Sequence, residues 1–175
     1  MLKNIKFVLL TLCFLFVNSY LLAESKLSFI DVNYIYNNSN AGKKINNQIK
    51  EKTKKINDEL SNYQKKIEEE KIKLNNQKNI LSKDEFVKQA RELEKKVKEF
   101  NVKLSKNKNE LKIYVNKAKN EFYLRLTKIV QDYAVSNSIE MILKKEDILM
   151  GKKTLDITKD IMNLFNKEVK IIKVN

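Results

Sequence analysis

Apolar side chains recur at seven-residue intervals along a stretch that lacks strong helix breakers. The sequence has no proline, and its two glycines, Gly42 and Gly151, stand far apart. From position 56 onward two apolar series interleave by four and three residues, which is the pattern of a coiled-coil seam. This pattern predicts a helix from about 41 to 79 that packs along one narrow stripe. The first series comprises Ile49, Ile56 and Tyr63, and the second comprises Leu60, Ile67, Leu74 and Leu81.

A second helix is predicted to run back along the first. The pattern breaks over 79–82, and Ser82 followed three residues later by Glu85 forms a capping box, which marks a helix start. The seam then resumes, although polar Asn107 interrupts it, as Glu70 does in the first helix. Two long helices joined by a short turn predict an antiparallel hairpin. The second seam comprises Ala90, Val97, Leu104, Leu111 and Ala118, interleaved with Phe86, Leu93, Phe100 and Tyr114.

Short segments at both ends of the hairpin have other patterns. Residues 26–32 are rich in β-forming side chains and read as a strand. Residues 139–143 and 148–150 read as the two strands of a β-hairpin, and 156–158 read as the start of a final helix. Residues 169–174 are apolar and basic, and they form either a strand or a tail.

The apolar stripe of the second helix widens after Ala118, where Phe122 and Leu126 join it. A narrow stripe suits a two-helix arm in water, whereas a broad stripe suits packing in a globular body. We therefore predict an α+β fold, mostly α, in which a long antiparallel coiled-coil hairpin stands on a small β-rich body. The arm comprises residues 41–118 with its tip near 79–82, and the body comprises 24–40 and 119–175.

The predicted body is too small to bury much apolar surface, and its isolated strands leave hydrogen-bonding edges open. Association between copies of the chain would remove both problems, so the pattern predicts an oligomer whose sheets join between subunits. The number of chains in this oligomer stays open at this point. The residues expected in the core of the shared body are Leu27, Phe29, Ile139, Met141, Leu143 and Ile148.

The first 23 residues have the three-part pattern of a secretory signal peptide. Lys3 and Lys6 supply a basic start, 7–17 is an apolar run, and Ala23 offers a small residue for cleavage. The apolar run is shorter than the about 20 residues that span a bilayer, although an uncleaved membrane anchor is the alternative. Cleavage after Ala23 would place the mature chain in the periplasm.

Residue counts exclude several classes of enzyme. The chain has no histidine, and its single cysteine, Cys13, lies within the predicted signal peptide. The mature chain would therefore lack a disulfide, a reactive thiol, and the commonest general base and metal ligand. Two glycines are too few for a glycine-rich phosphate loop. We predict no catalytic activity, no metal and no cofactor.

The chain is basic, with a formal net charge of +14, or +12 without Lys3 and Lys6 (14 − 2). Residues 41–79 hold eleven Lys against six acidic residues, and 83–135 hold fourteen Lys or Arg against eight. This balance favours acidic partners, whereas biased base composition is the alternative source of so many lysines. Any one of them can be an ordinary solvated residue. The densest basic stretch contains Lys103, Lys106, Lys108, Lys112, Lys117, Lys119, Arg125 and Lys128.

Distinct motifs flank the low-complexity hairpin. Residues 26–32 (KLSFIDV) follow the predicted signal peptide, and residues 39–43 (SNAGK) precede the first long helix. The predicted strand pair and the closing-helix motif DITKDI at 156–161 come after the hairpin. In this order the motifs resemble those of the Skp/OmpH periplasmic chaperones, over nearly all of residues 26–166. In that family a proline often stands at the position of Asn40.

The resemblance implies a homotrimer in which a β-rich trimerisation body carries three helical arms around a cavity. Unfolded outer-membrane proteins are held there without ATP, and lipopolysaccharide or the membrane surface is a further partner associated with the family. We therefore predict a periplasmic holdase whose basic arms contact the client collectively. A structural coiled-coil adaptor of the cell envelope is the alternative. Nucleic acid is not an expected physiological partner, because the chain is exported and lacks arginine-rich or aromatic base-reading motifs.

Overall fold

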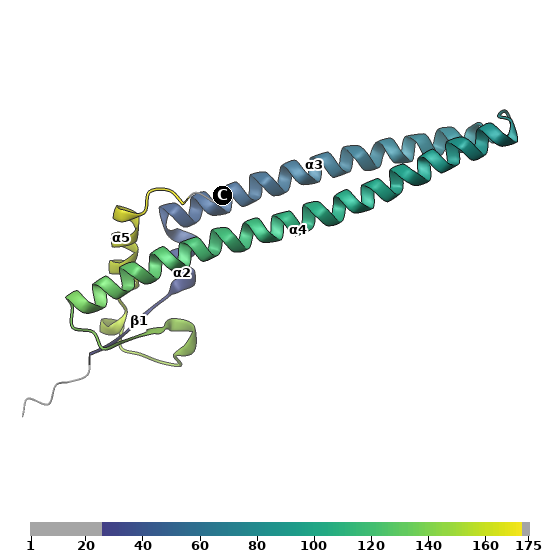
Figure 1. The fold of residues 1–175 in the computed structure, drawn as a ribbon. Helices are drawn as coiled ribbons and strands as arrows, with labels where there is room; N and C mark the ends of the chain where they lie inside the picture. The colour runs from purple at the N-terminus through teal and green to yellow at the C-terminus, as the bar shows by residue number, and fades with distance from the viewer. Residues whose placement is uncertain (1–25, 173–175) are drawn as a thin grey trace, which may run out of the picture.

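A long helical hairpin stands on a small body in the computed structural model, which describes residues 26–172 (Figure 1). This arrangement confirms the predicted α+β fold, mostly α. The predicted signal peptide, with Cys13, lies outside the described residues. In chain order the elements are β1 (Leu27–Ile30), α2 (Val32–Asn38), α3 (Asn40–Asn76), α4 (Lys83–Ser136), β2 (Met141–Lys144), the 3-10 turns η1 (Lys145–Asp147) and η2 (Lys153–Leu155), and α5 (Thr158–Glu168).

The two long helices form the predicted hairpin. Helix α3 has 37 residues and α4 has 54, which correspond to about 55 Å and 80 Å of helix at 1.5 Å per residue. The capping motif acts as predicted, because Ser82 Oγ accepts a hydrogen bond from the Glu85 amide at 3.3 Å. Within residues 26–172 no helix is both long and apolar enough to cross a membrane.

The start of α3 is held by two acceptors from different parts of the chain. Ser39 Oγ accepts from the Gly42 amide at 3.1 Å, and Asn166 Oδ1 accepts from the Asn40 amide at 2.8 Å. These amides belong to the first helical turn, which has no intrahelical acceptors for them. Gly42 also permits close packing of α2 on α3, since an added Cβ would overlap the Tyr36 carbonyl oxygen. The base of the arm is thereby joined to both α2 and α5.

The sheet has two parallel strands, and this corrects the predicted β-hairpin. Strand β1 pairs with β2 so that Leu27 lies opposite Met141. Residues 148–150 form no strand. That prediction was wrong because the chain leaves β2 through the 3-10 turn η1, and its next backbone hydrogen bond to the sheet is made on β1, where the Ile157 amide donates to the Phe29 carbonyl at 3.1 Å. The intervening chain must therefore loop from one edge of β1 to the other.

The six residues predicted for the core of the body divide into two groups. Phe29 and Ile139 are buried within the chain, and Ile148 is half-buried. The other three remain accessible on the sheet. The exposed fractions are 42% for Leu27, 53% for Met141 and 40% for Leu143.

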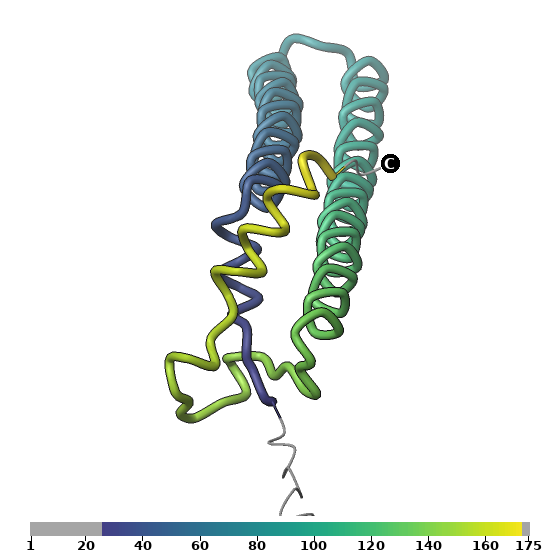
Figure 2. The backbone as a smooth tube through the Cα atoms, turned by 90° about the vertical axis from the view of Figure 1, so that its left-hand side faces the viewer, coloured from purple at the N-terminus to yellow at the C-terminus, as the bar shows by residue number. Residues whose placement is uncertain are grey.

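The hydrophobic core lies where α2, α4 and α5 meet. Phe122 and Phe165 are fully buried, with ring centroids 4.7 Å apart, and the Tyr36 and Phe122 rings form a T-shaped pair with centroids 5.0 Å apart. The end of the described chain adds to this core, since Val169 and Ile172 are 6% and 2% exposed. It is a tail without strand structure and passes across the base of the arm (Figure 2).

Replacing Asn166 with Ala should lower the free energy of unfolding by about 1 kcal/mol, because the first turn of α3 would lose a capping acceptor. Urea denaturation followed by circular dichroism would measure the change. Asn163→Ala is the matched control, since Asn163 is exposed on the same helix. Equal effects of the two substitutions would show that the Asn166 cap contributes nothing.

Candidate functional site

The helical arm is the candidate functional site, and contacts between its helices set their alignment. Tyr63 of α3 stacks on Phe100 of α4 with ring centroids 5.7 Å apart. Beside this pair, Lys103 Nζ lies 2.5 Å from Glu59 Oε1 and over the Tyr63 ring. Moving four residues toward the start of α3, from Tyr63 to Glu59, thus corresponds to moving three residues toward the end of α4, from Phe100 to Lys103. The helices are therefore antiparallel and in constant register through this region.

The seam between the helices is only partly covered. Leu60, Ile67 and Leu104 are all half-buried, whereas Phe122 and Leu126 in the body are 0% and 3% exposed. The difference arises because a two-helix hairpin covers each helix on one side only. Each seam side chain therefore loses less contact with water and contributes less stability than a body residue. The arm is the less stable part of the fold on this ground.

Glu70, which interrupts the first apolar series, forms an ion pair across the hairpin. Both its carboxylate oxygens accept hydrogen bonds from Lys96 Nζ, at 2.6 and 2.7 Å. These hydrogen bonds raise the pKa of Lys96, because they favour its charged form. Both side chains remain about half exposed, so solvent screens the pair and its contribution to stability is small. The main effect of this ion pair is to favour the observed alignment of α3 with α4.

Asn107 is a different kind of interruption, because nothing within the described residues compensates for it. Its Nδ2 atom is buried and has no hydrogen-bond partner there. A buried donor without an acceptor costs about 1–3 kcal/mol. This position is therefore a local weak point midway along the seam.

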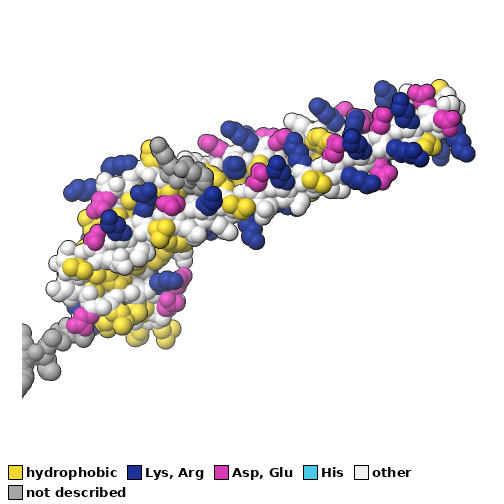
Figure 3. All heavy atoms as spheres, viewed as in Figure 1, with side chains coloured by type: hydrophobic (Ala, Val, Ile, Leu, Met, Phe, Trp, Pro, Cys, Tyr) yellow, Lys and Arg dark blue, Asp and Glu magenta, His cyan; other side chains and the backbone are white. Residues whose placement is uncertain are grey.

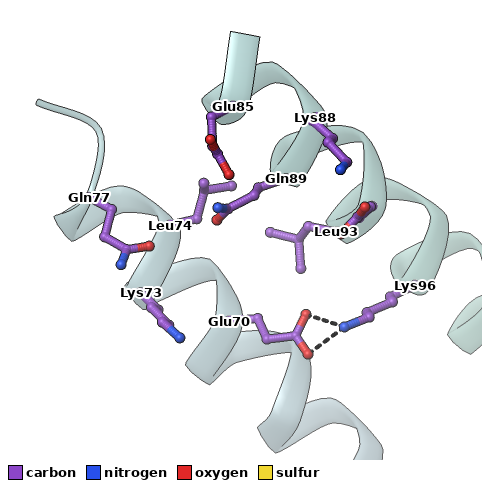
Figure 4. A pocket seen from close by; sticks show the side chains of 10 residues that line it. Glu70, Lys73, Leu74, Gln77, Glu85, Lys88, Gln89, Leu93 and Lys96 are labelled. Carbon is purple, nitrogen blue, oxygen red and sulfur yellow. Dashed lines mark hydrogen bonds and ion pairs between the residues drawn. The ribbon is translucent and has the colours of Figure 1, made fainter. Parts of the chain in front are cut away.

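A cleft of about 470 Å³ opens between the helices near the tip (Figure 4). Leu74 and Leu93 point into it, and charged and amide side chains surround them, including Glu85 and Gln89. The Glu70–Lys96 ion pair closes the side nearer the base. Such a mixed lining suits water and exchangeable polar contacts. Among residues 26–172, no group of three or more His, Cys, Asp or Glu side chains could hold a metal ion.

The eight cations predicted to contact clients do not gather on one face of α4. Each residue turns the helix by about 100°, so Lys103 and Lys108 flank the seam whereas Lys106 and Lys112 point elsewhere. Basic and acidic side chains alternate along the visible face of the arm (Figure 3). The arm is thus mixed in charge with a basic excess, and the client contact of these lysines stays a prediction.

Several of these cations already have partners within the chain. Lys119 Nζ lies 5.9 Å from the centroid of the Tyr36 ring. Lys106 and Arg125 lie 3.9 and 4.0 Å from the acidic residues Glu110 and Glu121. These ion pairs are exposed, so a client carboxylate could exchange for the internal one at little cost.

The residues that join the two helices by charge were missed by sequence reasoning. Glu59 precedes the seam residue Leu60, and Lys103 precedes Leu104, so each flanks its seam. Charges flanking a coiled-coil seam commonly pair between helices. The sequence does show opposite charges at these flanking positions. Assigning Glu59 to Lys103, however, requires knowing which residues of the two helices lie opposite each other.

Comparisons with known proteins decide the family. A sequence profile described as outer membrane protein (OmpH-like) matches residues 26–165. The chain belongs to the OmpH-like family. The matched region covers β1, the whole arm and most of α5, so the predicted resemblance is confirmed. A comparison with curated protein sequences finds no match.

The fold of this OmpH-like protein also matches a solved structure. That structure is a proposed outer membrane chaperone (OmpH-like) from Caulobacter crescentus, with a TM-score of 0.80. The match covers 86% of this chain and 89% of the other, at 19% sequence identity. At that identity the likeness establishes the shared fold, including the long arm.

Asn107→Leu should raise the stability of the arm by about 1–2 kcal/mol, because it removes an unpaired donor and adds apolar surface to the seam. Hydrogen exchange of the α4 amides around residue 107 should slow accordingly. Asn109→Leu is the matched control, because Asn109 is exposed on the same helix. Unchanged exchange around residue 107 would contradict the assignment of a weak point there.

Proposed function

We propose that this protein is an ATP-independent periplasmic holdase, which binds unfolded outer-membrane proteins between the arms of a homotrimer. The observation that carries the proposal is the hairpin of α3 and α4, which extends far beyond the body and has no large core of its own. Membership of the OmpH-like family supports the proposal. A signal peptide cleaved after Ala23 would deliver the chain to the periplasm.

The proposed trimer rests on the apolar surface that the body leaves uncovered. The strand register places Leu27 beside Met141, and Leu143 follows Met141 on the same face of β2. In the nearby loop Leu149 and Met150 are exposed by 102% and 86%. A grouped apolar surface of this kind typically marks an interface. Covering it with two further copies would extend the small core into the shared body predicted from the sequence.

Three arms around one space would hold a client through many weak contacts. The arms carry a basic excess, which would favour acidic groups of an unfolded chain. Each exposed charge contact contributes about 0–1 kcal/mol, but linked arms raise the effective concentration of the remaining sites. Contacts of this type exchange readily, as release of a client requires. Lipopolysaccharide or the membrane surface is a second acidic partner on the same ground.

The holding activity has a direct test. An outer-membrane protein diluted from urea should stay soluble at about one trimer per client in turbidity measurements, without nucleotide, because contacts of the client with the arms replace contacts between client chains. A cell-envelope adaptor would leave the aggregation unchanged, and that result would exclude the holdase. Serum albumin at the same mass concentration is the control for nonspecific crowding.

The oligomer has its own test. The double substitution Met141→Asp and Leu143→Asp should lower the mass from three chains to one in multi-angle light scattering, because the charges would lie on the apolar sheet face. Ile80→Asp is the control, since Ile80 is 81% exposed at the far end of the arm. An unchanged mass in the double variant would place the interface elsewhere.

A further inference from the structure

Helix α4 contains an 11-residue repeat that extends from the arm into the body. Residues 99–109, 110–120 and 121–131 read EFNVKLSKNKN, ELKIYVNKAKN and EFYLRLTKIVQ, and residues 132–135 begin a fourth unit with DYAV. Each complete unit has an acidic residue at its first position and Lys at its eighth, with Asn or Gln at its eleventh. Apolar residues occupy the second, fourth and sixth positions of every complete unit.

Packing within the chain explains two of the three apolar positions. Eleven residues make about three helical turns, so a given position of the unit returns to nearly the same face. The second position includes Phe100, which stacks on Tyr63, and the buried Phe122. The sixth position includes the buried Leu126. These side chains form the inward face of α4.

The fourth position lies on the opposite face, and it is apolar in all four units. It stands two positions after the second and two positions before the sixth, which places it about 160° away from each of them around the helix. Neighbouring members lie about 16 Å apart, so the four extend over about 50 Å of helix. The exposed fractions are 69% for Val102, 46% for Ile113, 66% for Leu124 and 83% for Val135. We call these four residues the outer stripe.

Between successive members of the outer stripe the sequence places a lysine and then an amide side chain. Four residues after each of its first three members comes a lysine, and three residues later comes an amide side chain. An acidic row lies beside the lysines, and Glu110 is 3.9 Å from Lys106. The lysines are Lys106, Lys117 and Lys128, and the amides are Asn109, Asn120 and Gln131.

The spacing argues against a helix or a membrane as the occupant of this face. A partner helix packs against apolar residues that recur every three or four positions, and a helix lying in a membrane needs a broad apolar face. Single apolar side chains about 16 Å apart provide neither. An extended polypeptide fits better, because about ten of its residues cover two such intervals at about 3.3 Å each, so a chain with apolar residues at alternate positions presents an apolar side chain to every second member. Lysines can then meet its carboxylates, and the amides can bond its peptide groups.

We propose that the outer stripe binds extended client segments in which apolar and polar residues alternate. Such alternation is the pattern of transmembrane β-barrel strands, and the inference rests on the holdase function proposed above. A client strand in this pattern offers an apolar side chain to the stripe at regular short intervals. It also presents acidic or peptide groups to the lysines and amides between. A continuously apolar segment would leave those polar groups without partners.

The test measures binding of a peptide in which Val alternates with Asp or Thr and which carries one Trp. The protein has no Trp, so the emission reports the peptide alone. The double substitution Ile113→Gln and Leu124→Gln should weaken binding of this peptide about tenfold. Ile72→Gln with Ile80→Gln is the control, because these exposed apolar residues lie on the arm outside the repeat. A peptide of the same composition with its Val residues in one block should bind wild type more weakly.

A second variant, Lys106→Gln with Lys128→Gln, should weaken binding of the alternating peptide at low salt and lose this effect at high salt. Unchanged circular dichroism would show that both variants fold. Equal affinity of the Ile113–Leu124 variant and wild type, or preference for the block peptide, would overturn the proposal. A changed oligomer mass, or loss of binding to anionic phosphatidylglycerol vesicles alone, would also overturn it by assigning the stripe to another copy or a membrane.

These outcomes separate the stripe from the holdase function. Wild type that fails to suppress client aggregation would remove the proposed function itself. Wild type that suppresses aggregation, together with an Ile113–Leu124 variant that does so equally well, would leave the holdase in place and remove the outer stripe as its contact surface.

Discussion

The arm depends on the buried aromatic cluster that holds its two helices together at the base. Phe122 of α4 packs against Tyr36 and Phe165, so α2, α4 and α5 meet at one side chain. Asn166 then bonds the first amide of α3 and links that helix to α5. The seam between these helices of 37 and 54 residues is only half covered, so it contributes less stability per residue than the body does. The body supplies the burial that the arm lacks.

The inward and outward faces of α4 follow the same 11-residue repeat but differ in burial. Its inward positions change from half-buried in the arm to fully buried at Phe122 and Leu126. Its outward positions stay exposed throughout, from 46% at Ile113 to 83% at Val135. The seam of the arm is narrow and partly polar, while apolar, cationic and amide groups recur on its outer side. Together they suit a partner that is extended and held loosely.

Much of the fold could be predicted because its signals are local. The heptad series, the cap at Ser82 and the widening after Ala118 each depend on neighbours within a few turns of helix. The strand predicted over 148–150 failed because the chain after β2 forms the 3-10 turn η1 and next bonds the sheet at β1 through residues 156–157, a contact that local pattern does not reveal. The cation cluster was predicted from composition along the chain, which takes no account of the direction in which each lysine points. The 11-residue repeat was readable but was obscured by the stronger seven-residue series.

The sequence by itself determined the long helices, the position of the turn and the basic excess of the arm, because periodicity, capping and charge act over short distances. Only the tertiary structure decided the parallel pairing of β1 with β2, the ion pair between Glu70 and Lys96, and the cap from Asn166. Each of these joins residues far apart in the chain. Their energies depend on distance and burial, which arise only when the hairpin has closed onto its body.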